Sequence, residues 1–208
     1  MKIPLLYKKY HIDKDYTSIG LFRAIKDNYN INNVFYPGSH VHITPSLIFS
    51  KVTYADSYRN TYKFFKETDT IDFLINQKEY PGEANFRFYQ QDYNKTFKEL
   101  GKEFDMVISQ YAGFVGQAAK PYLQKGGILV CNNSHGDASM ASMDKDFKLV
   151  AVYRRYADDK FTISNKNLDE YLVPKNKNKP TKGELLKSMK GIAYTKSPSG
   201  YIFEKISE

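Results

Sequence analysis

Three residues whose chemistry suits a nucleotide follow successive apolar runs in the first half of the chain: Gly38, Asp56 and Asp92. A glycine lets the backbone approach a ligand that a β-carbon would exclude. Asp56 follows Gly38 by 18 positions, close to the offset of about 20 at which an acidic residue binds ribose hydroxyls in dinucleotide-binding folds. Asp92 could accept a hydrogen bond from an adenine amino group, beside the aromatic face of Tyr93. A Pro-Gly turn and two helix caps are the ordinary structural alternatives.

The catalytic residue is not identified by the sequence, which offers three candidates: Tyr111, Asn133 and His135. The last two belong to residues 131–137, the densest polar cluster of the chain. His135 could act as a base, because an imidazole titrates near neutrality. Tyr111 could offer its ring to a cation. A polar loop in which Asp137 caps the next helix accounts for the cluster equally well.

We expect no metal site. His40 and His42 could present two imidazoles on one side of an extended chain, with Asp56 or His135 as a further ligand. A metal site needs at least a third ligand at suitable spacing. Because the sequence shows none, surface or core histidines are the better interpretation, and Cys131 is most simply a buried thiol.

Positioning these residues requires strands that end at a common edge. Apolar runs bounded by turn residues predict strands over 33–36, 51–55, 86–90, 104–109, 127–131, 147–154 and 201–206. Helices are expected over 15–28, 57–68, 93–101, 113–123, 138–143 and 183–189, with a short one beginning at Thr44-Pro45. Segments 106–108 and 128–130 are wholly apolar, which is typical of strands buried on both faces. The alternation predicts an α/β, three-layer Rossmann-like fold with a mostly parallel sheet of about seven strands and an antiparallel C-terminal strand.

The chain is expected to form a single domain over residues 1–208. Within it we predict an N-terminal helical segment over 1–30, a βα core over 31–155, a Lys/Asn-rich insertion over 165–190 and a terminal hairpin over 191–208. In that hairpin, 192–196 and 201–206 would pair across the turn at 197–200. No internal repeat is present in the sequence.

The order of these motifs resembles class I S-adenosylmethionine-dependent methyltransferases over residues 30–155. Gly38, Asp56 and Asp92 look like the family's first three motifs, and 104–109 looks like its fourth strand. The run 122–130, with a leucine followed by Gly126-Gly127 and an apolar strand, resembles the start of its fifth.

The resemblance implies methyl transfer from S-adenosylmethionine to an acceptor that the sequence does not identify. It implies that the cofactor site contains Tyr36, Pro37, Gly38, Ser39, Asp56, Asp92 and Gln110. The first motif departs from the family pattern, because Tyr36 replaces an acid and His40 and His42 replace glycines. The sequence after 109 also lacks the Pro-Pro motif of amino-methylating nucleic-acid enzymes, which argues against methylation of bases.

The net charge of +8 is concentrated in one segment. Residues 174–196 hold seven lysines and one glutamate, so they carry +6 of it. A solvated, lysine-rich loop is the favoured interpretation. A single cysteine, no signal peptide and no long apolar run predict a cytoplasmic protein without a membrane partner.

Two alternatives to an enzyme stay open at this point. The departures in the first motif favour a catalytically inactive, methyltransferase-like binding or regulatory protein. A nucleic-acid-binding protein would instead use the segment from Lys175 to Lys196 with the neighbouring Tyr171, Tyr194 and Tyr201. A nicotinamide-dependent oxidoreductase is disfavoured, because the Gly-x-Gly-x-x-Gly fingerprint is absent.

Overall fold

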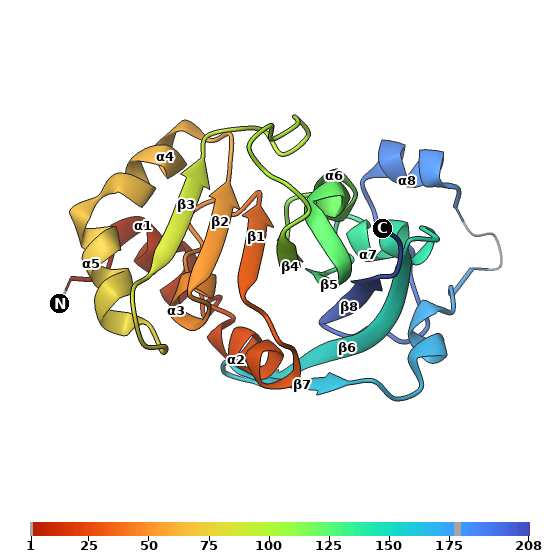
Figure 1. Cartoon of the computed structure of the whole chain (residues 1–208). Coiled ribbons are helices and arrows are strands. Elements are labelled where there is room, and N and C mark those ends of the chain that lie inside the picture. The colour runs from red at the N-terminus through yellow and green to blue at the C-terminus, as the bar shows by residue number, and fades with distance from the viewer. Residues whose placement is uncertain (1, 177–179) are drawn as a thin grey trace.

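The computed structural model describes residues 2–176 and 180–208. Lys177 and Lys179, two of the lysines counted in the basic segment, lie outside the described residues. In the described part of the chain, eight strands form one sheet in the order β3-β2-β1-β4-β5-β8-β6-β7 (Figure 1). The strands are β1 (Asn33–Pro37), β2 (Lys51–Ala55), β3 (Asn85–Tyr89), β4 (Phe104–Ser109), β5 (Leu123–Cys131), β6 (Phe147–Ala157), β7 (Lys160–Ser164) and β8 (Gly200–Lys205).

Successive strand residues point into two hydrophobic cores, one on each face of the sheet. Val34 and Met106 belong to the first core, and their neighbours Phe35 and Val107 belong to the second. This alternation of fully apolar strands is what a sheet covered on both faces requires. The predicted three-layer α/β class is therefore confirmed.

The two helical layers divide along the chain (Figure 1). The first core is covered by α1 (Leu5–Tyr7), α2 (Ile19–Asn28), α3 (Pro45–Ile48), α4 (Arg59–Lys66) and α5 (Thr68–Gln77). The second is covered by α6 (Val115–Ala119), α7 (Asp137–Ser142) and α8 (Lys182–Ser188). Among the described residues, no helix has both the length and the apolar character needed to cross a membrane.

The strand pairing in the C-terminal part of the chain differs from the prediction. β8 lies between β5 and β6 and runs antiparallel to both, so the expected antiparallel C-terminal strand is confirmed. The prediction that residues 192–196 pair with this strand is wrong, because Tyr194 instead forms an isolated bridge with Pro174. Instead, β6 and β7 form a hairpin at one edge of the described sheet, and β7 was not predicted from the sequence.

Several helices are shorter than predicted. α2 begins at Ile19 because Asp15 and Ser18 adopt left-handed backbone conformations, with φ of 52° and 55°. The helix predicted over 93–101 is wrong: the segment forms turns, and the Phe97 amide donates to Tyr122 Oη at 2.8 Å. The helix predicted over 57–68 ends at 66 as α4, and α5 follows directly.

A backbone contact couples α2 to the turn between β6 and β7. A β-carbon at Gly20 would lie 1.6 Å from the carbonyl oxygen of Asp159. We therefore expect Gly20→Ala to lower the free energy of unfolding by about 1–3 kcal/mol, because the turn must move away from the helix. Urea unfolding measures the change. Gly183→Ala, in a helical position where a β-carbon would lie 3.9 Å from its nearest neighbour, is the control and should not destabilise the protein. Equal midpoints for the two variants would contradict the steric account.

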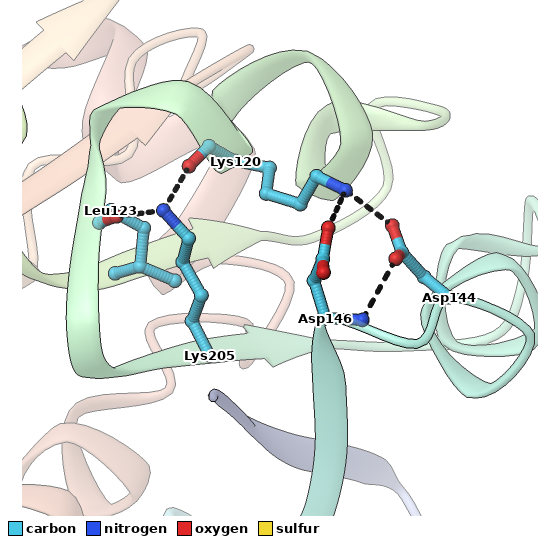
Figure 2. Close-up of polar contacts among 5 residues, drawn as sticks. All are labelled: Lys120, Leu123, Asp144, Asp146 and Lys205. Atoms are coloured by element: carbon cyan, nitrogen blue, oxygen red, sulfur yellow. Dashed lines mark hydrogen bonds and ion pairs between the residues drawn. The ribbon is translucent and has the colours of Figure 1, made fainter. Parts of the chain in front are cut away.

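A cluster of charged side chains (Figure 2) joins the start of β5, the start of β6 and the end of β8. These strand ends lie at the edge of the sheet opposite the carboxyl ends of β1 and β4. Lys120 Nζ lies 2.8 Å from a carboxylate oxygen of both Asp144 and Asp146. The buried Lys205 Nζ donates to the carbonyl oxygens of Lys120 and Leu123 at 3.3 and 2.7 Å. Because these contacts join segments far apart in sequence, the cluster fastens this edge of the sheet.

Candidate functional site

The turn that follows β1 contains Gly38 in a left-handed conformation, with φ of 69°. Its amide donates to the carbonyl oxygen of Ala55 at 2.7 Å. A β-carbon at this position would lie 2.5 Å from that of Ala112 and 3.6 Å from the ring of Tyr93. The fold itself therefore requires a glycine here, both for the backbone conformation and for contact with the segment after β4.

Asp56, directly after β2, is joined to this turn. One carboxylate oxygen accepts from the His40 amide at 2.8 Å, and the other accepts from the Tyr58 amide at 2.8 Å. The half-buried carboxylate thus stabilises both the turn after β1 and the residues that lead into α4. Each carboxylate oxygen keeps a free lone pair that could accept a further hydrogen bond.

Asp92, after β3, forms a local turn by accepting from the Asn94 amide at 2.9 Å. Its neighbour Tyr93 connects this end of the sheet to the others. The Tyr93 hydroxyl donates to the carbonyl oxygen of Ala112, and the ring lies beside Gly38. The ends of β1, β2, β3 and β4 are therefore linked to one another by direct contacts at one edge.

A cleft of about 350 Å³ opens beyond the carboxyl ends of β1 and β4. Its walls are mostly rings and contain no carboxylate; they comprise Tyr10, His11, Lys14, Tyr16, Tyr36, Gly38, Ser39, His40, His42, Gln110 and Tyr111. Its size falls within the range of ligand sites. Of the predicted cofactor residues, Tyr36, Gly38, Ser39 and Gln110 line the cleft, whereas Pro37, Asp56 and Asp92 do not.

The N-terminal segment that forms one wall of the cleft was not predicted to be part of the site. It is attached at several points: Arg155 Nη1 donates to the carbonyl oxygen of Asp15 at 3.0 Å and also pairs with its carboxylate. Thr17 Oγ1 donates to Asp159 at 2.6 Å. The dense spacing of Tyr and His between residues 7 and 16 was the available signal for this wall.

Two of the wall residues, His11 and His42, stack on each other, with ring centroids 4.3 Å apart. His42 Nε2 donates to the carbonyl oxygen of Thr17 at 2.8 Å, so Nδ1 accepts from the Tyr36 hydroxyl at 3.0 Å. Burial lowers the pKa of His42 to about 3 and the pKa of His11 to about 4. Both rings are therefore neutral at pH 7.

His11 leaves one nitrogen free. Its Nδ1 donates to the carbonyl oxygen of Tyr16 at 3.3 Å. Its Nε2, which then carries a lone pair, is buried and has no hydrogen-bond partner within the described residues. Buried polar atoms are almost always paired, so an unpaired acceptor beside a cleft indicates a place for a donor group.

Strained backbone is concentrated around the cleft. His40 and Tyr111, which line it, have φ of 47° and 62°, and Asp15 and Ser18 flank the same N-terminal wall with φ of 52° and 55°. Non-glycine residues in this region cost on the order of 1–3 kcal/mol each and gather at functional sites. Their position supports a functional role for the cleft.

The cleft adjoins a second cavity, here called the middle hollow, of about 270 Å³. Tyr16, Gln110 and Tyr111 line both. The remaining walls of the middle hollow are Ser18, Leu21, Tyr153, Arg155, Phe161 and Ser199. Gln110 Nε2 donates to the Tyr153 hydroxyl at 3.3 Å, which orients the amide between the two spaces. The arrangement therefore provides two adjacent compartments separated by the ring contact of Tyr16 and Tyr111.

The structure does not bring the other catalytic candidates to the cleft. The Asn133 side chain connects α7 to the segment at Ile192: it donates to the carbonyl oxygen of Ile192 at 2.9 Å and accepts from the amide and hydroxyl of Ser139. His135 is exposed and lines neither compartment. Asp137 does not cap α7 as expected; its carboxylate accepts from the Ser109 hydroxyl and from the Gly116 amide. Of the three candidates, Tyr111 alone lines the cleft.

Two other expectations concern metals and nucleic acids. No group of three or more possible metal ligands occurs among the residues that the structure describes. The tyrosines considered for base stacking are buried: Tyr171, Tyr194 and Tyr201 are 7, 2 and 2% exposed. Their rings are therefore unavailable to a single strand, which removes the aromatic part of that hypothesis.

A five-strand parallel block in the order β3-β2-β1-β4-β5, followed by an antiparallel strand, is the fold of class I S-adenosylmethionine-dependent methyltransferases. Two solved structures, both described as S-adenosylmethionine-dependent methyltransferases, superpose on almost the whole chain. One is a methyltransferase from Thermotoga maritima (7% identity, 97% of this chain and 94% of the other, TM-score 0.52). The other is from Methanococcus maripaludis (13% identity, 97% of this chain and 90% of the other, TM-score 0.50). No model of a sequence family and no curated protein sequence matches the chain.

Proposed function

We propose that the protein is an S-adenosylmethionine-dependent methyltransferase whose cofactor lies along the carboxyl edge of β1–β4. One observation carries the proposal: the residues that follow β1, β2 and β3 meet at one edge of the sheet. The Asp56 carboxylate accepts from the amide of His40 in the turn at Gly38. The ring of Tyr93, the residue after Asp92, lies 3.6 Å from where a β-carbon at Gly38 would be. The resemblance to class I methyltransferases implies that residues at these positions hold the adenosyl group.

The residues present fit such a ligand. Asp56 has free lone pairs for ribose hydroxyls, and Asp92 for an adenine amino group. The cleft supplies aromatic walls, and His11 Nε2 is an unpaired acceptor for one of the cofactor's N–H or O–H groups. When bound, S-adenosylmethionine would supply an electrophilic methyl group: the acceptor's nucleophile would bond to the methyl carbon as the bond to the positively charged sulfur breaks and S-adenosylhomocysteine leaves.

The chain's own residues then provide alignment and exclusion of water rather than covalent chemistry. The N-terminal segment forms one wall of the cleft, and the neutral His11 and His42 place no imidazolium beside a sulfonium. Tyr16 and Tyr111, whose ring centroids are 5.2 Å apart, offer faces or edges at the boundary between the cleft and the middle hollow. An acceptor in the middle hollow would therefore approach from the side opposite the N-terminal histidines.

Calorimetric titration with S-adenosylmethionine and with S-adenosylhomocysteine is the direct test. Binding of either is expected. Absence of heat from both at high protein concentration would reject the proposal. Binding of the product together with methyl transfer to no acceptor tested would favour the alternative, an inactive binding protein.

The Tyr111→Ala variant tests whether the sulfonium of bound S-adenosylmethionine lies against the Tyr111 ring. We expect S-adenosylmethionine to bind about tenfold more weakly, because a ring facing a desolvated cation contributes on the order of 1–2 kcal/mol. The neutral thioether of S-adenosylhomocysteine should lose much less affinity. Tyr62→Ala, on α4 and away from the cleft, is the control. Equal losses for the two ligands would place the sulfonium away from Tyr111.

A further inference from the structure

A third cavity, here called the arginine hollow, lies at the carboxyl end of β6. It has a volume of about 470 Å³ and is lined by Arg154, Arg155, Tyr156, Thr162, Ser197, Pro198 and Ser199. Arg155 and Ser199 also line the middle hollow. The cleft, the middle hollow and the arginine hollow therefore form a series along one edge of the sheet, each sharing residues with the next.

The charge of this series is one-sided, because none of the three cavities has an aspartate or glutamate in its lining. The two arginines of the arginine hollow differ in their partners. Arg155 is paired with Asp15 and holds the N-terminal segment. Arg154 is exposed and takes part in no ion pair within residues 2–176 and 180–208; its guanidinium lies 5.7 Å from the centre of the Tyr171 ring. Arg154 thus contributes an uncompensated positive charge.

Three residues with aliphatic hydroxyl groups line the same hollow as Arg154. Thr162 lies directly opposite Arg154 in the β6–β7 ladder, so the two side chains share one face of the sheet. Ser199 Oγ accepts from the Arg155 amide at 2.9 Å, which leaves its own proton free to donate. Ser197 completes the set. A guanidinium with hydroxyl donors and no competing carboxylate is the arrangement that recognises an oxyanion.

We propose that the arginine hollow binds an oxyanion, a carboxylate or a phosphate group, carried by the methyl acceptor. This inference rests on the proposed function and specifies its substrate class: an anionic acceptor whose charged group sits at Arg154, in the cavity that shares Arg155 and Ser199 with the middle hollow. Arg155, already neutralised by Asp15, separates the two spaces and is a positioning residue rather than the main source of charge.

The experiment measures the binding of two simple probes, inorganic phosphate and acetate, to the full chain at constant ionic strength. We expect at least one of them to bind, and the two arms distinguish phosphate from carboxylate recognition. Arg154→Gln should reduce the affinity of that probe at least tenfold. Arg87→Gln is the matched control, because Arg87 is also exposed on a strand but lies on β3, at the far end of the sheet.

Binding of neither probe, or equal effects of the two substitutions, would overturn the inference. The same two variants are titrated with S-adenosylhomocysteine, whose affinity Arg154→Gln should leave unchanged. Loss of phosphate and acetate binding with intact S-adenosylhomocysteine binding would follow from the anion site alone. If S-adenosylhomocysteine fails to bind the wild-type chain while a probe binds through Arg154, the anion site stands and the methyltransferase proposal falls.

Discussion

Replacing Lys120 with Met is expected to lower the free energy of unfolding by about 2 kcal/mol, with a lower urea midpoint and an unchanged m-value. The ammonium group of Lys120 lies 2.8 Å from Asp144, whose side chain is only 7% exposed (Figure 2). Without Lys120, the Asp144 carboxylate stays buried with no cation beside it. The partial exposure of Lys120, at 26%, is why the expected loss is below that of a fully buried pair.

The pH dependence of this variant follows from the carboxyl group. Burial raises the pKa of Asp144, but the hydrogen bonds from Lys120 and from the Asp146 amide outweigh burial and hold it below its ordinary value. A lowered folded-state pKa gives stability that is complete above the unfolded value and is lost as the pH falls through the folded value. Lys120→Met should therefore flatten the acid limb of the stability curve.

Lys125→Met is the matched control, because Lys125 also pairs with an acid, Glu208, but both side chains are more than half exposed. Its urea midpoint should stay close to that of the wild type. If Lys125→Met and Lys120→Met shifted the midpoint equally, burial of Asp144 would not be the source of the effect.

The second large effect is expected for Asp137→Asn, measured as a change of stability with pH. Burial raises the pKa of Asp137 to about 6, although the hydrogen bonds from Ser109 and Gly116 oppose the rise, and its Oδ1 has no partner in the described chain. A raised folded-state pKa makes the protein lose stability as the pH increases from the unfolded value toward 6. The loss for the wild type is on the order of 3 kcal/mol.

Asparagine keeps the shape but carries no charge, so the variant should lack this loss. Urea unfolding between pH 4 and 7 tests it: relative to the wild type, Asp137→Asn should gain about 3 kcal/mol across that range. Ser109→Ala, which retains the carboxyl group and removes one of its donors, should keep the downward slope. Parallel profiles for wild type and Asp137→Asn would show that Asp137 does not titrate in this range.

The strands that are buried on both faces could be predicted from the sequence, because a short, continuous apolar run between turn residues is typical of a strand inside a covered sheet. The β7 sequence, Lys160 to Ser164, lacked that signal: it is an edge strand of mixed polarity whose residues are mostly half-buried or exposed. The predicted terminal hairpin failed for a related reason, since local turn residues at 197–200 cannot reveal that β8 pairs with distant strands.

The candidate site was predictable where residues follow the strands and not elsewhere. The convergence of Gly38 and Asp56 follows from strand order, which the sequence pattern supports. The N-terminal wall and the orientation of Asp137 depend on contacts across more than 20 residues, such as Arg155 with Asp15. A glycine at position 38 does not by itself indicate a ligand, because the absence of a side chain is also needed to make room for Ala112.

The insertion of β8 between β5 and β6 has a consequence for biosynthesis. The ribosome delivers β6 and β7 before β8, yet both can join the sheet only through β8. Until residues 200–205 emerge, β5 presents an unpaired edge and the β6–β7 hairpin has no place to dock. The sheet can therefore be completed only after β8 has been synthesised, and a chain that lacks residues 200–205 would expose two unpaired strand edges at the centre of the sheet.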